Sequence, residues 1–191
     1  DGSKIAWISM ARDGYEADKQ RLMIAYIDWD KSFPRAWGIT DVTENFKYNA
    51  AGPVWAADSK SIYFNSLAEG LQGMYEAKAP EFDAPVNAKI KPAPWKIERI
   101  TGDQMWNDFG SPFHIVYLEG GGDPRDLPGA SMDFPTELVA VTVGLEKTEY
   151  TPVTQENEHI LSQLAEHETE ARWLQTVDGK SLLTGVLYPP P

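Results

Sequence analysis

Residues 54–66, VWAADSKSIYFNS, place a polar turn between two apolar segments. The first residues of the chain, DGSKIAWIS at 1–9, repeat the turn and the second segment, with Asp1 aligned on Asp58 and Ser9 on Ser66. Asp-Gly and Asp-Ser favour a tight turn, and the alternating residues that follow are typical of a half-buried β-strand. A weaker third copy, DGKSLL, lies at 178–183. The sequence therefore predicts a repeated turn-and-strand unit.

Strand-like segments separated by turn-forming residues fill the space between the copies. The spacing of 57 residues, from Asp1 to Asp58, exceeds the ~40–50 residues of a typical propeller blade, so the pattern predicts a propeller with loop insertions. The predicted fold class is all-β: a partial β-propeller of about three four-stranded antiparallel blades. The first blade takes strands at 5–10, 21–28 and 38–43; the second takes 53–56, 61–66, 73–77 and 95–101; further strands are expected at 113–118 and 136–143.

Three segments depart from this pattern. Residues 78–94 carry four prolines and are predicted to form an extended surface loop. Residues 120–129, GGGDPRDLPG, are rich in turn formers and are also expected to be a loop or an interruption of the ordered chain. Residues 155–171 give the one helical signal, an apolar stripe of Ile160, Leu161 and Leu164, although two short polar strands would fit equally well.

Composition limits the possible functions. The 191 residues are 42% hydrophobic and carry a net charge of −12, so a folded core is expected and nucleic acid or an anionic membrane surface is disfavoured as a partner. Cysteine is absent, which excludes disulfides and cysteine-ligated metals within these residues. No apolar run approaches the ~20 residues of a membrane span.

Four stretches together resemble a known family: residues 1–28 (DGSKIAWISMARDGYEADKQRLMIAYID), 49–66 (NAAGPVWAADSKSIYFNS), 131–141 (SMDFPTELVAV) and 170–190 (EARWLQTVDGKSLLTGVLYPP). They look like the propeller domain of prolyl oligopeptidase family serine peptidases, in the bacterial dipeptidyl-peptidase V and acylaminoacyl-peptidase branch. The segments RDGYEADK and SMDFPTEL are the most particular to this family, whereas the Asp-Gly-Lys turn occurs in many propellers.

The resemblance implies an organisation and a role. Residues 1–175 would form the partial propeller, and residues 176–191 would form the exit segment and first strand toward an α/β-hydrolase domain that carries Ser, Asp and His elsewhere in the parent chain. The chain is therefore expected to be a cut piece of a secreted or periplasmic bacterial exopeptidase. Its expected role is noncatalytic, without a cofactor: it would gate access for short peptides and help to position their amino termini. The oligomeric state stays open, a homo-oligomer included.

The sequence signals for catalytic and metal-binding residues are weak. Ser131 lies in Gly-Ala-Ser-Met-Asp, which lacks the second glycine of a nucleophile elbow and precedes a strand. His167-Glu168 begins like a zinc motif, but residue 171 is alanine; His114 and His159 are expected to be structural and solvated, respectively. Residues 120–122, three glycines, lack the pattern of a phosphate loop. We expect no catalytic or metal site within this chain.

The charged segment 11–21, ARDGYEADKQR, interrupts a predicted hairpin and is the candidate binding site. Related dipeptidyl peptidases present an acidic pair to the substrate's ammonium group. By that resemblance, Glu16 and Asp18 would bind the amino terminus, while Arg12 or Arg21 would hold these carboxylates or contact a carbonyl. The competing interpretation is a solvated or salt-bridged loop.

A different class of function fits the same repeats. A propeller of the TolB kind, serving as a protein-interaction scaffold without a hydrolase, would carry the same turns and strands. The continuation of the reading frame distinguishes the two: a Gly-x-Ser-x-Gly motif about 100 residues further on supports the peptidase. A third option, a propeller enzyme with its own axial site, lacks a converging set of polar residues.

Overall fold

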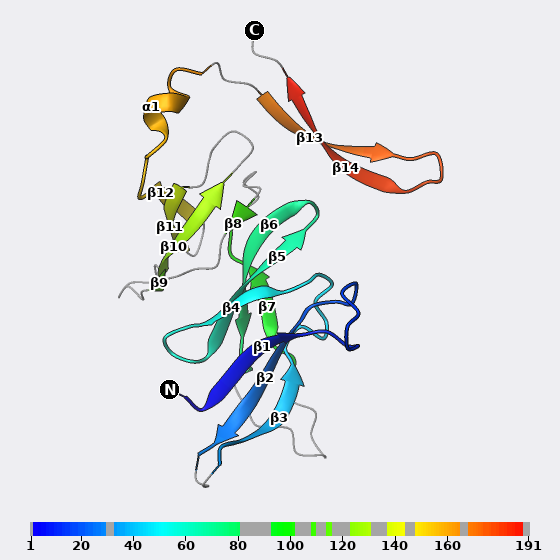
Figure 1. Ribbon diagram of the computed structural model, residues 1–191, viewed down its shortest axis with the longest axis vertical. Helices are drawn as coiled ribbons and strands as arrows, with labels where there is room; N and C mark the ends of the chain where they lie inside the picture. Colours follow the sequence, from blue (N-terminus) through cyan, green and yellow to red (C-terminus); the bar gives the residue numbers. More distant parts are fainter. Residues whose placement is uncertain are drawn as a thin grey trace.

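The computed structural model describes residues 2–29, 33–80, 93–101, 108–109, 114–115, 123–130, 137–143, 148–164 and 168–188. These residues form small antiparallel sheets and one helical turn, so the all-β prediction is confirmed at this level. Figure 1 shows the sheets following one another along the long axis of the molecule, from the N-terminal sheet to a C-terminal hairpin. Among the described residues, no helix is long and apolar enough to cross a membrane.

The first two sheets are simple meanders. β1 (Lys4–Ser9), β2 (Arg21–Asp28) and β3 (Arg35–Asp41) pair in that order. β4 (Ala51–Trp55), β5 (Ser61–Ala68), β6 (Leu71–Lys78) and β7 (Lys96–Arg99) form the second sheet, again in chain order. The predicted strands of both blades are therefore confirmed, with β3 beginning three residues earlier than expected. The loop predicted at 78–94 lies mainly outside the described residues.

The repeated turn has the same backbone in each copy. The residue after aspartate adopts a positive φ in all three: +80° at Gly2, +58° at Ser59 and +79° at Gly179. In the second copy the carboxylate of Asp58 accepts a hydrogen bond from the Lys60 N–H at 2.9 Å, which closes the turn. The predicted turn chemistry is thus confirmed, and Ser59 occupies a conformation that normally favours glycine.

The third sheet contains β8 (Asp108–Phe109), β9 (His114–Ile115), β10 (Asp123–Ala130), β11 (Glu137–Val143) and β12 (Thr148–Pro152). β10 lies between β11 on one side and the short strands β8 and β9 on the other. The expected loop at 120–129 is therefore wrong from residue 123 onward. Pro124 and Pro128 have no backbone N–H to donate. Both are opposite residues of β11, but neither pairs with β8 or β9. The strand tolerates them because its partner strands on that side do not pair with these two residues.

A threonine closes each of the three sheets in the same way. The Oγ1 atoms of Thr43, Thr101 and Thr154 accept hydrogen bonds from the backbone N–H of Leu22, Met74 and Leu138, at 3.0, 3.0 and 2.9 Å. The residue before each threonine, Val42, Ile100 or Val153, donates its own N–H to the carbonyl of the same partner. By this match β2, β6 and β11 are equivalent strands, so the first three sheets share one unit, and the C-terminal hairpin is a separate, two-stranded sheet.

Two hydrophobic clusters hold these sheets together. The first joins Leu22 and Ile24 of β2 to Ile62, Phe64 and other residues of the second sheet. The second cluster joins the opposite side of the second sheet to the third sheet; its members are Ala56, Tyr63, Met74, Ile100, Val139 and Val141, with Tyr150 packed against them. The second sheet is therefore buried on both faces, between its two neighbours.

The C-terminal part differs from the helix expected at 155–171. The helix α1 comprises only Glu158–Leu161, and residues from Glu168 onward belong to β13 (Glu168–Gln175), which pairs along its whole length with β14 (Ser181–Tyr188). The apolar stripe is too short to bury a helix, since Ile160 and Leu164 are 51% and 61% exposed. The alternative of strand structure is correct for 168–171. The division expected after residue 175 falls at the turn of this hairpin and stays a prediction.

Candidate functional site

The charged loop between β1 and β2 is ordered by contacts among its own residues. The Tyr15 N–H donates to the Arg12 carbonyl at 3.4 Å, and the Asp18 N–H donates to the Tyr15 carbonyl at 3.1 Å. Gly14 takes a positive φ of +68°, which lets the chain turn between them. The loop is therefore a compact double turn that projects from the end of the first hairpin.

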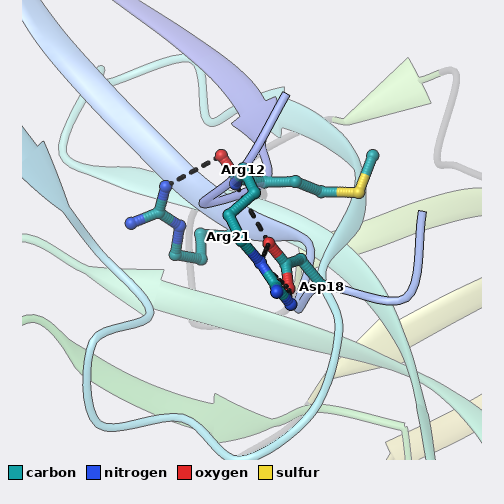
Figure 2. Close-up of polar contacts among 4 residues, drawn as sticks. Arg12, Asp18 and Arg21 are labelled. Atoms are coloured by element: carbon teal, nitrogen blue, oxygen red, sulfur yellow. Dashed lines mark hydrogen bonds and ion pairs between the residues drawn. The ribbon is translucent and has the colours of Figure 1, made fainter. Parts of the chain in front are cut away.

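Arg12 and Asp18 form the centre of this loop (Figure 2). Arg12 donates to the Asp18 carboxylate through its backbone N–H at 3.0 Å and through Nε at 3.0 Å, and Nη2 bonds to the other carboxylate oxygen. The Arg12 guanidinium also lies over the Tyr15 ring, with Cζ 3.7 Å from the centroid. Charge-assisted bonds with this fork geometry give a more specific contact than a simple ion pair.

This pairing changes the acidity of Asp18. The hydrogen bond from the Arg12 side chain lowers the pKa of Asp18, and the backbone N–H of Arg12 and the charge of Arg21 act in the same direction. The same bond raises the pKa of Arg12. Asp18 is therefore ionised at neutral pH, but its charge is matched by Arg12.

Arg21 lies beside this pair and contacts a backbone carbonyl of its own loop, while the expected contact with a substrate carbonyl stays a prediction. Its Nη2 donates to the carbonyl of Met10 at 3.1 Å, which fastens the start of the loop to the start of β2 (Figure 2). Its Nε is buried and has no hydrogen-bond partner among the described residues. Arg21 also lines a cavity of about 860 Å³, together with Asp41, Glu44, Trp95 and other residues.

Lys19 anchors the other end of the loop. Its Nζ donates to the carbonyls of Thr43, at 2.7 Å, and Phe46. The Gln20 N–H next to it donates to the side chain of Asn49 at 3.0 Å. The loop is thus tied to the segment between the first two sheets, and this segment begins with the Thr43 closure described above.

Glu16 differs from the other acidic residue of the predicted pair. Its side chain is exposed and makes no hydrogen bond or ion pair with the described part of the chain. The structure thus brings Arg12, Asp18 and Arg21 together and leaves the Glu16 carboxylate pointing to solvent from the same loop. The contributions of Tyr15 and Lys19 were missed, because neither the stacking nor the bonds to residues 43 and 46 have a local sequence signal.

The remaining candidates that fall within the described part of the chain add no second site there. No group of three or more His, Asp or Glu side chains that could hold a metal occurs within the described residues. His159 lies exposed in α1 and accepts a bond from Gln163 only through its backbone carbonyl. His114 lies in β9, opposite Asp126 of β10. Ser131, His167 and residues 120–122 lie outside the described residues.

Two curated proteins match the chain over nearly all of its length. Dipeptidyl-peptidase 5 of Porphyromonas gingivalis is 33% identical over 191 residues, which is all of this chain and 23% of that protein. Dipeptidyl-peptidase 5 of Porphyromonas endodontalis is 36% identical over 189 residues, 99% of this chain and again 23% of the relative. The chain thus spans about a quarter of the length of these relatives. No family model matches it.

Proposed function

We propose that this chain, which matches a portion of the dipeptidyl-peptidase 5 proteins, is a noncatalytic part of a serine exopeptidase that acts on peptides with a free amino terminus. The observation that carries the proposal is the loop at 11–21. It holds an exposed carboxylate, Glu16, on a backbone that Arg12, Asp18 and Lys19 already order. A preordered loop loses little conformational entropy when it binds a ligand.

In this proposal Glu16 binds the ammonium group and Asp18 positions the loop. An ammonium ion competes poorly for Asp18, because that carboxylate is held by Arg12 through three donor atoms. The Glu16 carboxylate has no such competitor among the described residues. Arg12 and Arg21 then keep the loop in place, and Arg21 is suited to contact a nearby peptide carbonyl.

The three stacked copies support a partial β-propeller with gating as its second role. Stacked antiparallel sheets of four strands are the building units of propellers. A ring of such sheets with a narrow channel would admit short or unfolded peptides and exclude folded proteins. This proposal has three further parts, which rest on the resemblance to the dipeptidyl peptidases. They are an enclosed chamber for the peptide, an α/β-hydrolase domain that carries the catalytic residues, and a periplasmic or secreted location.

A serine-directed probe tests the noncatalytic role. The full-length parent protein and the 191-residue chain are each treated with a fluorophosphonate and assayed on a chromogenic dipeptidyl substrate. The proposal predicts labelling and turnover by the full-length protein, with the labelled serine outside these residues, and neither with the chain alone. Labelling of a serine within the chain, together with turnover that the probe abolishes, would contradict it.

A further inference from the structure

Two Asp-Gly steps lie wholly within the described residues: Asp13-Gly14 in the loop at 11–21, and Asp178-Gly179 in the turn between β13 and β14. In such a step the glycine nitrogen can close a five-membered ring with the aspartate side chain, because glycine has no Cβ to obstruct the approach. Both steps are exposed, and φ is positive at both glycines, +68° at Gly14 and +79° at Gly179. Exposure and the glycine φ therefore do not distinguish the two steps.

Hydrogen bonds hold both reacting groups at Asp178-Gly179. The Gly179 N–H donates to the Thr176 carbonyl at 2.9 Å. The Asp178 carboxylate accepts a bond from the Thr176 hydroxyl and pairs with Lys180 Nζ at 2.8 Å. The bonds from Lys180 and Thr176 also lower the pKa of Asp178, so its carboxyl group stays ionised at neutral pH. A reaction between the two groups therefore needs the turn to open first.

The step Asp58-Ser59, in the second copy of the same turn, is held in a similar way. The Ser59 N–H donates to the Ala56 carbonyl at 3.0 Å, and the Asp58 carboxylate accepts the Lys60 N–H at 2.9 Å. Both the nitrogen and the carboxylate of this step are thus engaged.

Neither group is held at Asp13-Gly14. The bond from the Tyr15 N–H to the Arg12 carbonyl spans this step and uses neither of its residues. Within the described part of the chain, the Gly14 N–H and the Asp13 carboxylate make no hydrogen bond or ion pair. The loop is ordered around Asp13 by its neighbours, while the Asp13 side chain is free to approach the glycine nitrogen.

We propose that Asp13 is a modification site, at which aspartate isomerises spontaneously to isoaspartate. The Gly14 nitrogen attacks the carbon of the protonated Asp13 carboxyl group. A C–N bond forms and a C–O bond breaks, and the amide proton leaves with the carboxyl hydroxyl as water. A second water molecule opens the resulting succinimide at either carbonyl, which returns aspartate or gives the β-linked isoaspartate.

The modification changes the backbone of the candidate binding loop. Isoaspartate adds one carbon to the main chain between Arg12 and Tyr15, whose backbone hydrogen bond at 3.4 Å closes the first turn of the loop. The closure cannot keep its geometry across a longer main chain, so the order of the loop declines as the protein ages. The inference is independent of the proposed role of Glu16.

Peptide mapping of the aged full-length parent protein tests the proposal. The protein is incubated for weeks at physiological temperature and neutral pH, in native buffer and in denaturant. Isoaspartate in the peptides that contain Asp13 and Asp178 is then quantified by electron-transfer fragmentation. The proposal predicts that isoaspartate accumulates at Asp13 at least about tenfold faster than at Asp178 in the native protein, and at similar rates in denaturant, where the bonds around Asp178 are lost.

Asp178 is the internal control of this experiment, and Asp13→Glu supplies a second one. Glutamate would have to close a six-membered ring, which forms much more slowly. Asp13→Glu should therefore abolish the modification at residue 13 and leave the slow rate at Asp178 unchanged. Equal native rates at Asp13 and Asp178, or isoaspartate at Asp13 in denaturant only, would overturn the proposal.

Discussion

Ser59 has a φ of +58°, a region where the Cβ of an L-residue is crowded, while the equivalent residues of the other two repeats are glycines. The turn tolerates serine because Asp58 accepts a hydrogen bond from the Lys60 N–H and the Ser59 N–H donates to the Ala56 carbonyl at 3.0 Å. The strain is therefore local and is offset by the closure of the turn.

Ser59→Gly is expected to stabilise the protein. Relief of the left-handed strain outweighs the greater freedom of glycine in the unfolded chain, so the free energy of unfolding should rise by about 0.5–1 kcal/mol. Urea denaturation measures this change. The reciprocal variant Gly179→Ser, at the same turn position with φ +79°, should destabilise instead, and a loss of stability in Ser59→Gly would contradict the interpretation.

The Arg12–Asp18 pair predicts a specific dependence on pH. Because the folded state lowers the pKa of Asp18, the pair contributes stability fully above the ordinary aspartate pKa and loses it as the pH falls through the lower folded value. Arg12→Gln should raise the pKa of Asp18 toward its ordinary value, as measured by NMR titration of the side-chain carboxyl. Lys4→Gln, outside the loop, should leave the pKa of Asp18 unchanged. If the pKa of Asp18 were also unchanged in Arg12→Gln, the pairing would be disproved.

At the scale of the elements, the repeated threonine closure explains why each outer strand ends where it does. Each closure is a hydrogen bond from a backbone N–H to the side-chain oxygen of Thr43, Thr101 or Thr154. The bonds donated by Leu22 and Met74 are buried. The common pattern, a valine or isoleucine followed by threonine, recurs at 42–43, 100–101 and 153–154. Such a dipeptide is too common in protein sequences to be recognised as a closure without the structure.

Thr101→Val should lower the free energy of unfolding by about 1–3 kcal/mol, because the buried Met74 N–H loses its acceptor while the shape of the side chain is retained. Thermal and urea denaturation would measure the change. Thr40→Val is the matched control, since the Thr40 hydroxyl only donates to the Gly38 carbonyl in a half-buried site, and it should change stability much less. Similar losses in the two variants would refute a special role for the closure.

The strands that the sequence predicts best are those with alternation and flanking turns, such as β2 and β5. β10 was missed because its two prolines and Gly129 favour a loop locally, and only the partial pairing by β8 and β9 makes a strand compatible with them. The helix at 155–171 was over-predicted because Ile160 and Leu164 of its apolar stripe stay mostly exposed among the described residues. Tertiary partners decide both cases, and a single sequence does not reveal them.

At the scale of the whole molecule, the three copies and the loop have separate roles. The stacking of sheets depends on residues that recur in each copy, whereas the loop at 11–21 belongs to the first copy alone in the described part. The sequence placed Arg12, Glu16, Asp18 and Arg21 in one candidate binding loop, and their role in binding stays a prediction. It did not predict that Asp18 is engaged and Glu16 exposed, because that difference depends on side-chain geometry.

Selectivity for the amino terminus is the measurement that tests the central claim most directly. In the full-length parent protein, kcat/KM is measured for a dipeptidyl substrate with a free amino terminus and for its N-acetylated form, in wild type, Glu16→Gln and Asp13→Asn. Asp13 lies exposed in the same loop, and its variant makes the same change of charge.

A charge-assisted hydrogen bond to the ammonium group is worth ~1.5–3 kcal/mol, so Glu16→Gln should lower kcat/KM for the free substrate about tenfold or more. Its activity on the acetylated substrate should not change, and Asp13→Asn should resemble wild type on both. An equal effect of Glu16→Gln and Asp13→Asn, or no effect of either, would contradict the proposal that this loop positions the peptide's amino terminus.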